Sequence, residues 1–384
     1  MTQTYFADYA WLGGDAVSRD VAIDVTDGRI VAVRPGAERA GTHLRGVTLP
    51  GLANAHSHAF QRALRGRTQR GGGSFWTWRE DMYALATTMT SDRCFELAKG
   101  AYAEMLQAGI TTVGEFDYLH FSDALIAAAR EVGIRLTLLD ACYLAGGFDE
   151  PPNAAQRGFS DGDAAKWAER VSAIKGAKVG AAIHSVRAVP RDQLDTVVEF
   201  ARGKPLHFHV SEQRAENDAC LAAHGLTPVQ LLAEHGALGQ GSTAVHATHL
   251  HDGDDLGETT TCMCPTTERD LADGIGDAGP RLALGSDSHA VIDLFEEARA
   301  VELNLRLKTE RRGHFTAAAL LRGATNHGCL GWEDAGRIEV GARADLVTLD
   351  LTSPRLEMAE EATMLESIVF AATAADVSNV IVGC

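Results

Sequence analysis

Residues 47–58 read VTLPGLANAHSH, which is an apolar run, a Pro-Gly turn and two histidines separated by one residue. The run Val47–Leu49 predicts a buried strand that leads into the histidines. Residues two apart in a strand point to the same side, so the imidazoles of His56 and His58 can bind one cation. The stretch therefore predicts a strand that ends in a pair of metal ligands.

Seven more short apolar runs follow along the chain and alternate with helical patterns. This alternation is typical of βα units around a parallel sheet, and with the first run it gives eight predicted strands. The seven runs are Thr111–Phe116, Ile134–Tyr143, Lys178–Ser185, Lys204–Glu212, Ser242–His249, Glu258–Pro265 and Arg281–Ser288.

Helix start and stop signals lie between the runs, at Ser91–Gly109, Ser122–Gly133 and Pro190–Gly203. A doubly wound open sheet would more often need a glycine-rich phosphate loop, and the sequence has none. We therefore predict an α/β fold, a (β/α)8 TIM-type barrel. The carboxyl ends of its strands share one face, where active sites are built. The polar residues predicted at that face are His56, Glu115, His184, His209, His246 and Asp287.

The two ends of the chain resemble each other in pattern. The segment through AIDVTDGRIVAVRPG has short alternating strands and a D-G turn signal, and GRIEVGARADLVTLDL has the same character. We predict that they pair as one small β-sheet domain. The predicted boundaries are 1–48 for its first part, 49–335 for the barrel and 336–384 for its second part.

Composition excludes several classes of protein. The 384 residues carry 52 acidic side chains against 35 Lys plus Arg, a formal net charge of −17. Nucleic acid and anionic membranes both require a basic face, so neither is an expected partner. No run reaches the ~18 apolar residues of a membrane span, and the first residues do not form a signal peptide. We expect a cytoplasmic protein, with a homodimer as the common default for soluble enzymes.

The side chains suited to metal binding are histidine and aspartate. The seven cysteines include no C-x-x-C pair, so they suggest neither a disulfide framework nor a thiolate zinc site, and we expect most to be buried apolar residues. His209, His246 and Asp287 end other predicted strands and add nitrogen and oxygen donors to the His56 and His58 pair. Such a donor set suits zinc and also accepts iron or manganese.

The order PGLANAHSH, HFHVSE, VHATHL and GSDSH resembles the amidohydrolase superfamily, in its branch of deaminases. The resemblance implies one divalent metal ion, expected to be Zn²⁺, held by His56, His58, His209 and Asp287. It also implies that Glu212 shuttles the proton, that His246 assists the water and that Asp287 accepts or orients its proton. A metal lowers the pKa of its bound water, so the implied reaction is attack by metal-bound hydroxide.

A closer resemblance, to the N-formimino-L-glutamate deiminase family, lies in HSHAFQRALRG, SFWTWREDMY, GEFDYLH, HSVRAV and CPTTERDLADG. It implies hydrolysis of a small dianionic substrate to N-formyl-L-glutamate and ammonia in histidine degradation. Arginine suits bidentate carboxylate recognition, in agreement with such a substrate. The implied substrate-binding residues are Gln61, Arg79, Tyr118, His184 and Arg187.

Two alternatives remain. A guanine or other aminoheterocycle deaminase of the same superfamily would offer a slot for a flat neutral ring, where Arg79 and Arg187 would be costly to leave unpaired. A catalytically silent barrel scaffold would be expected to lose metal ligands. For His207 we expect a position facing the helix layer, and for His249 and His251 positions in loops.

The chain departs from the family pattern at three places. Asp117 stands where the family usually has histidine. The loops after Tyr118 and between Gly276 and Arg281 look short, and relatives continue beyond the final VSNVIVGC. These departures affect the substrate contacts around Tyr118 and the small sheet domain, and they leave the predicted metal ligands unchanged.

The net charge of −17 would repel a dianionic substrate, so attraction has to be local. Residues 61–80 carry five arginines and one acidic residue. We expect this segment to make the barrel mouth basic, helped by Arg187, because screening over ~8 Å weakens the distant acidic surface. The arginines of the segment are Arg62, Arg65, Arg67, Arg70 and Arg79.

Overall fold

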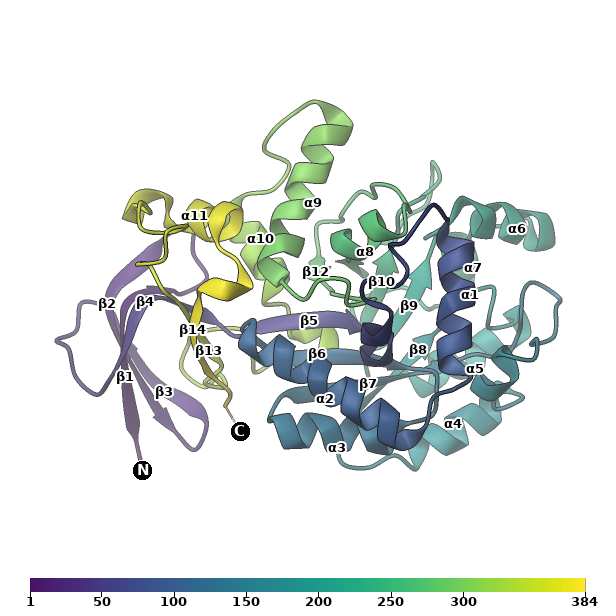
Figure 1. The fold of residues 1–384 in the computed structure, drawn as a ribbon, viewed down its shortest axis with the longest axis horizontal. Coiled ribbons are helices and arrows are strands. Elements are labelled where there is room, and N and C mark those ends of the chain that lie inside the picture. The colour runs from purple at the N-terminus through teal and green to yellow at the C-terminus, as the bar shows by residue number, and fades with distance from the viewer. Residues whose placement is uncertain (384) are drawn as a thin grey trace.

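The computed structural model describes residues 1–383 and contains two sheets. Eight parallel strands follow one another in chain order around a barrel, from β5 to β12, as the sequence predicts. The barrel lies at one end of the molecule and a six-stranded sheet lies at the other (Figure 1). The barrel strands are β5 (Leu52–Ser57), β6 (Ile110–Asp117), β7 (Arg135–Cys142), β8 (Lys178–Ile183), β9 (Leu206–Val210), β10 (Ser242–His246), β11 (Thr260–Met263) and β12 (Leu282–Leu284).

The barrel closes beyond the end of β12, where the chain meets β5. The backbone N–H of Asp287 donates to the carbonyl of His56 at 3.0 Å, and the N–H of His58 donates to the carbonyl of Asp287 at 3.2 Å. Closure thus places the His-x-His pair directly beside the aspartate.

The small sheet combines both ends of the chain, in the order β14-β13-β4-β1-β2-β3. Val47–Leu49, which we predicted as the start of the first barrel strand, belongs to β4 of this sheet. The barrel strand starts only at Leu52, after Gly51, because β4 finds its partners in β1 and β13. The strands are β1 (Gln3–Trp11), β2 (Val17–Thr26), β3 (Arg29–Arg34), β4 (Thr42–Pro50), β13 (Leu346–Leu349) and β14 (Val377–Ile381).

Gly51 allows the passage from the small sheet to the barrel. A Cβ at this position would lie 2.3 Å from Oγ1 of Thr111 and 2.9 Å from Cβ of Asp345. Both distances are shorter than real Cβ contacts, so a side chain here would force the two sheets apart.

Helices cover the outside of the barrel and extend to the small sheet. Two of them, at Ser91–Gln107 and Ser122–Val132, follow the predicted patterns. Thr90, and not Ser91, caps α2 by accepting from the N–H of Arg93, and α3 ends at Gly133 in the left-handed conformation that glycine favours. The α-helices are α1 (Phe75–Ala86), α2 (Ser91–Gln107), α3 (Ser122–Val132), α4 (Ala164–Ser172), α5 (Leu194–Phe200), α6 (Arg214–His224), α7 (Pro228–Glu234), α8 (Pro265–Asp270), α9 (Leu294–Thr309), α10 (Ala317–Ala324) and α11 (Met364–Ala371).

Short 3₁₀ turns join these elements. The pattern that predicted one helix over Pro190–Gly203 gives a 3₁₀ turn followed by the short helix α5. The 3₁₀ turns are η1 (Ala59–Leu64), η2 (Gln156–Phe159), η3 (Arg191–Gln193), η4 (Gly328–Leu330), η5 (Glu361–Thr363) and η6 (Ala374–Asp376). Within residues 1–383, no helix combines the length and apolar character needed to cross a bilayer.

The inside of the barrel is a packed core below the mouth. A small apolar cluster fills it, and η4 lies against its lower end, where the carbonyl of Leu330 accepts from Thr137. His207 lies here as well, with its Nε2 2.9 Å from the carbonyl of Cys329, so our expectation that it faces the helix layer is wrong. Residues two apart in a strand share a side, and His207 therefore points inward below His209.

The cysteines agree with the expectation of buried apolar residues. The six described ones are free, and five of them are buried; Cys384 lies outside the described residues.

Candidate active site at the barrel mouth

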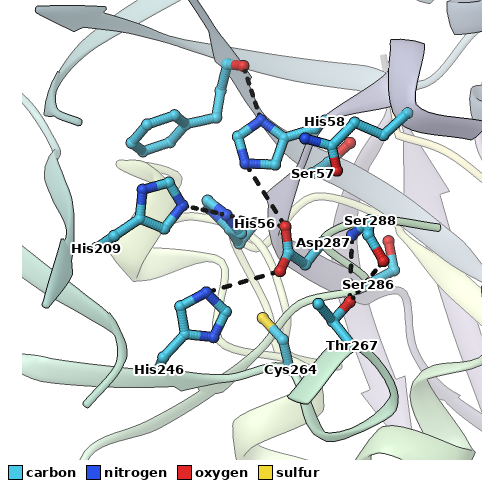
Figure 2. Close-up of polar contacts among 12 residues, drawn as sticks. His56, Ser57, His58, His209, His246, Cys264, Thr267, Ser286, Asp287 and Ser288 are labelled. Atoms are coloured by element: carbon cyan, nitrogen blue, oxygen red, sulfur yellow. Dashed lines mark hydrogen bonds and ion pairs between the residues drawn. The ribbon is translucent and has the colours of Figure 1, made fainter. Parts of the chain in front are cut away.

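Four imidazoles and a carboxylate converge at the carboxyl ends of the barrel strands (Figure 2). Nε2 of His56 lies 3.0 Å from Nε2 of His209. Oδ1 of Asp287 lies 3.4 Å from Nε2 of His56 and 3.5 Å from Nε2 of His58, and its Oδ2 lies 3.6 Å from Nε2 of His246. All five side chains are buried. We call His56, His58, His209 and Asp287 the ligand cluster.

The backbone at the strand ends is unusual. His246 and Asp287 have φ angles of 70° and 41°, and Ser211, two residues after His209, has a φ of 52°. Left-handed conformations are unfavourable for side chains other than glycine, and they concentrate at functional sites. Here they turn the chain sharply where β9, β10 and β12 end, which directs His246 and Asp287 into the mouth.

The orientation of two rings shows where their lone pairs point. Nδ1 of His209 lies 2.8 Å from the carbonyl of His184, and Nδ1 of His58 lies 3.3 Å from the carbonyl of Phe116. A carbonyl can only accept, so each Nδ1 carries the proton. Burial lowers the pKa of His209 to about 4 and holds the pKa of His58 well below its usual range, so both rings are neutral. Nε2 of His58 therefore presents a lone pair toward Asp287, and Nε2 of His209 presents one toward Nε2 of His56.

Lone pairs and a carboxylate that face one another in a buried space repel unless a cation lies between them. The donor atoms of His56, His58 and His209 lie within 4.8 Å of one another, and so do those of His56, His246 and Asp287. Nitrogen and oxygen donors at this spacing fit a divalent transition metal. The residues predicted as metal ligands thus lie together and could hold one ion.

A hydrogen-bond network outside the barrel holds the segment from Ser57 to Ala59. Glu115 accepts from the hydroxyl of Ser57 at 2.5 Å and from the N–H of Ala59 at 2.7 Å, and burial raises its pKa to about 8. The hydroxyl of Ser57 also lies 3.1 Å from Nε2 of His289. Glu115, which we expected at the mouth, therefore faces outward and fixes the turn on which His58 lies.

Glu212 and His246 face each other beside the ligand cluster. Oε1 of Glu212 lies 3.7 Å from Nε2 of His246. Burial raises the pKa of Glu212 to about 7, and the nearby His246 opposes that shift only in part. A carboxyl group that titrates near neutrality can both accept and return a proton.

His246 is further held by Glu268, a residue that our sequence analysis gave no role. Oε1 of Glu268 lies 3.4 Å from Nδ1 of His246 and accepts from the N–H of Cys264 at 2.9 Å. Burial alone would lower the pKa of His246, but Glu212 and Glu268 raise it well above its usual range. Glu268 lies in the first turn of α8, directly after β11. This position near the carboxyl end of a predicted strand could have identified Glu268 as a residue of the site. His249, which we expected in a loop, lies in the turn after β10 and lines a separate surface hollow.

A cavity opens onto the ligand cluster. Apolar side chains of α1, among them Trp76, Trp78 and Met82, form part of its wall. All five side chains predicted to bind substrate line the same cavity: Gln61, Arg79, Tyr118, His184 and Arg187.

The two arginines of this set have capacity to bind a ligand. Nε of Arg79 and Nη1 of Arg187 are buried without a hydrogen-bond partner among residues 1–383. The guanidinium of Arg79 lies over the ring of Trp76 at 4.5 Å, while Arg187 lies near the carboxylate of Glu216. Unsatisfied buried guanidinium donors are costly, so the cavity favours an anionic occupant.

The basic segment contributes less to the mouth than we expected. Arg62 and Arg65 pair with Glu104 of α2 at 2.8 and 3.0 Å, and this carboxylate neutralises part of their charge. The arginines that line the cavity are Arg79 and Arg187. Local attraction at the mouth therefore depends on these two side chains.

Asp117, where the family pattern has histidine, does not line the cavity. Its carboxylate accepts from the N–H of Leu119 at 3.0 Å and from the hydroxyl of Ser122 at 2.9 Å. This residue therefore holds the turn that follows β6.

Comparison with known proteins places this geometry in a family. The model of the amidohydrolase family matches residues 47–383. The chain is 35% identical to formimidoylglutamate deiminase of Pseudomonas aeruginosa, over 98% of this chain and 92% of that protein. It is 29% identical to 5-methylthioadenosine/S-adenosylhomocysteine deaminase of Natronomonas pharaonis, over 95% of this chain and 87% of that protein.

Solved structures agree with this assignment. The fold superposes on an amidohydrolase from Brucella melitensis with a TM-score of 0.88 and 33% identity, covering 99% of this chain and 93% of that one. It superposes on an adenosine deaminase from Xanthomonas campestris with bound zinc with a TM-score of 0.83 and 25% identity, covering 99% and 91%. The chain belongs to the amidohydrolase family and is a hydrolase that acts on C–N bonds.

Proposed function

We propose that this deiminase converts N-formimino-L-glutamate and water into N-formyl-L-glutamate and ammonia, as a step of histidine degradation. The C=N bond of the formimino group is replaced by a C=O bond, and its nitrogen leaves as ammonia. The observation that carries the proposal is a pair of half-buried arginines, Arg79 and Arg187, each with a buried guanidinium nitrogen that lacks a partner among residues 1–383, in a cavity that ends at the ligand cluster. The similarity to formimidoylglutamate deiminase supports the same substrate.

The ligand cluster would hold one divalent ion, for which we propose zinc. A zinc-bound adenosine deaminase of the same fold supports that choice. When bound, such an ion lowers the pKa of a water molecule and so makes a nucleophile available at neutral pH.

The residues around the ion would handle the protons. Asp287 and His246 would flank the attacking water: the carboxylate of Asp287 would accept a hydrogen bond from it, and His246 would orient it. The carboxylate of Glu212 would take a proton from the water and return it to the departing nitrogen, for which a pKa of about 7 is suited. Glu268 keeps the His246 ring in place through Nδ1.

The cavity wall would orient the substrate. Arg79 and Arg187 would each receive a carboxylate, since arginine donates to a carboxylate through two parallel hydrogen bonds. Gln61, Tyr118 and His184 lie nearer the ligand cluster in our proposal and would contact the formimino end. Their mutual contacts support this arrangement, because the amide of Gln61 donates to the hydroxyl of Tyr118 at 3.2 Å.

The test compares ammonia release from N-formimino-L-glutamate, guanine and 5′-methylthioadenosine by the purified, zinc-loaded protein. We expect turnover of N-formimino-L-glutamate alone. Ammonia release from guanine or 5′-methylthioadenosine, without release from N-formimino-L-glutamate, would show that the enzyme is an aminoheterocycle deaminase. A folded protein that binds no metal and is inert with all three would be a silent scaffold.

A further inference from the structure

Two buried tyrosines and a glutamine form a hydrogen-bonded group against the cavity. Tyr83 lies on α1, Tyr143 directly follows β7, and Gln156 begins η2. The hydroxyls of the two tyrosines are 3.0 Å apart. The side-chain nitrogen of Gln156 donates to the hydroxyl of Tyr83 at 3.2 Å and to that of Tyr143 at 2.9 Å. All three side chains are at most 4% exposed.

The amide orientation of Gln156 is fixed by the backbone. Its Oε1 accepts from the N–H of Asn153 at 2.9 Å, and an N–H can only donate. The NH₂ end must therefore face the tyrosines, where its two hydrogens fill one lone pair on each hydroxyl oxygen.

The direction of the hydrogen bond between the tyrosines follows from a count of donors. Tyr143 also interacts with the guanidinium of Arg187, which has only donors to offer. Among residues 1–383, the hydroxyl of Tyr143 has no acceptor within hydrogen-bond distance other than the hydroxyl of Tyr83, so its own hydrogen goes to Tyr83. The oxygen of Tyr83 then accepts from Gln156 and Tyr143, so its lone pairs are occupied and its own hydrogen is left over.

The free hydroxyl hydrogen of Tyr83 can point into the cavity. Tyr83 lines the cavity, whereas Tyr143 and Gln156 lie behind it. The guanidinium of Arg79 lies 5.5 Å from the centre of the Tyr83 ring, and Arg187 interacts with both Tyr83 and Tyr143, so Tyr83 lies close to both cationic groups of the wall. A hydroxyl that can only donate, in such surroundings, fits an anionic oxygen.

We propose that the hydroxyl of Tyr83 donates a hydrogen bond to a carboxylate of the substrate, which makes Tyr83 a specificity-determining residue for a dicarboxylate. The proposal rests on the proposed function, because it takes the substrate to carry two carboxylates. Gln156 and Tyr143 are positioning residues that act through Tyr83, since they fill its acceptor sites and leave only its donor free.

The test is Tyr83→Phe, which keeps the aromatic ring, and with it the contact to Arg79, and removes the hydroxyl. A hydrogen bond to a charged group corresponds to about 10- to 100-fold in binding, so we expect KM for N-formimino-L-glutamate to rise by about that factor. The kcat value should change by less than about threefold, because the hydroxyl does not act on the formimino carbon. Tyr9→Phe removes a hydroxyl in the small sheet, bonded to Arg19, and serves as the matched control.

Two monocarboxylate analogues separate carboxylate recognition from general damage. N-formimino-4-aminobutyrate lacks one carboxylate of the substrate, and N-formimino-L-2-aminobutyrate lacks the other. The preference of the wild-type enzyme for the dicarboxylate over one of the analogues, measured as a ratio of kcat/KM values, should fall about tenfold in Tyr83→Phe.

Each result decides one question. An unchanged KM, a loss confined to kcat, or unchanged ratios for both analogues in an active enzyme would overturn the role of Tyr83 and leave the proposed function in place. A wild-type enzyme that does not hydrolyse N-formimino-L-glutamate would overturn the proposed function and this inference with it.

Discussion

Glu212 shows how burial changes the titration of one side chain. An exposed glutamate is ionised at neutral pH, but burial at the barrel mouth raises the pKa of Glu212 to about 7. The residue lies outside the ligand cluster and faces His246 at 3.7 Å. Its proposed role is therefore proton transfer and not metal binding.

We predict that Glu212→Gln keeps its metal and loses at least about 100-fold in kcat, because an amide has the same shape and cannot transfer the proton. Metal content measured by mass spectrometry should equal that of the wild type, and ammonia release gives kcat. Near-normal turnover would remove Glu212 from the mechanism.

The role that we propose for Arg187 is substrate binding. We predict that Arg187→Ala lowers kcat/KM for N-formimino-L-glutamate by about 100-fold, mainly through KM, because a charge-assisted carboxylate contact is lost. Arg187→Lys should recover only part of the loss, since lysine cannot form the bidentate contact. Steady-state kinetics measures both variants, and an unchanged kcat/KM in Arg187→Ala would contradict a carboxylate role.

Among the elements, the segment between β13 and β14 depends on one buried carboxylate. Asp376, at the end of η6, accepts from Nε of Arg355 at 2.8 Å, from the N–H of Thr373 at 2.8 Å and from the hydroxyl of Ser353. Burial alone would raise the pKa of Asp376, but these hydrogen bonds outweigh it and lower the pKa to about 2. The carboxylate thus fixes the path of the chain into β14.

We predict that Asp376→Asn lowers the free energy of unfolding by about 1–3 kcal/mol at pH 7. The folded pKa lies below the unfolded value of about 3.9, so the charged form contributes stability above pH ~4 and loses it as the pH falls toward 2. Denaturant unfolding measured from pH 7 to pH 3 should therefore show a difference in the free energy of unfolding between the two proteins that is constant down to pH ~4. Below pH ~4 this difference should become smaller. A difference that widens toward low pH would contradict the role of the charge.

At the scale of the whole molecule, a buried ion pair connects the two sheets. Arg135 begins β7 of the barrel and pairs with Asp345, which directly precedes β13 of the small sheet; their side chains are 7% and 0% exposed. Asp345 also accepts from the N–H of Gly383 at 2.8 Å, while its backbone carbonyl accepts from the N–H of Gly51 at 2.9 Å. The pair thus anchors both chain segments of the small sheet to the barrel.

We predict that Asp345→Asn destabilises the protein by about 3–5 kcal/mol, because the guanidinium of Arg135 is left buried without its counter-charge. The exposed pair of Arg337 and Glu339 provides the control, and Arg337→Gln should cost at most about 1 kcal/mol. Chemical denaturation measures both variants. Equal losses in the two would show that burial does not distinguish these pairs.

Local features of the sequence were sufficient for much of the fold. Apolar runs and helix caps act over a few neighbouring residues, so the seven runs after the first could be predicted from the pattern, as could the helices at Ser91–Gly109 and Ser122–Gly133 and part of the one at Pro190–Gly203. The side-chain types at the strand ends were equally visible, because the ends of parallel strands meet at one face.

Two of the errors arose where a residue's partner is distant in the sequence. Val47–Leu49 joins the small sheet because its neighbours are β1 and β13, and the charge of Arg62 is balanced by Glu104 of α2. The inward position of His207 could have been predicted, since residues two apart share a side of a strand.

The sequence by itself determined the barrel, the family resemblance and the chemical types of the donors at its mouth, because these depend on periodicity and on residue identity. Only the tertiary structure decided which lone pairs and protons face one another. The neutral rings of His58 and His209, the contact of Glu268 with His246 and the free hydrogen of Tyr83 each depend on atoms supplied by several segments. Hydrogen bonds are directional and act within about 3.5 Å, so they are fixed only when those segments are brought together.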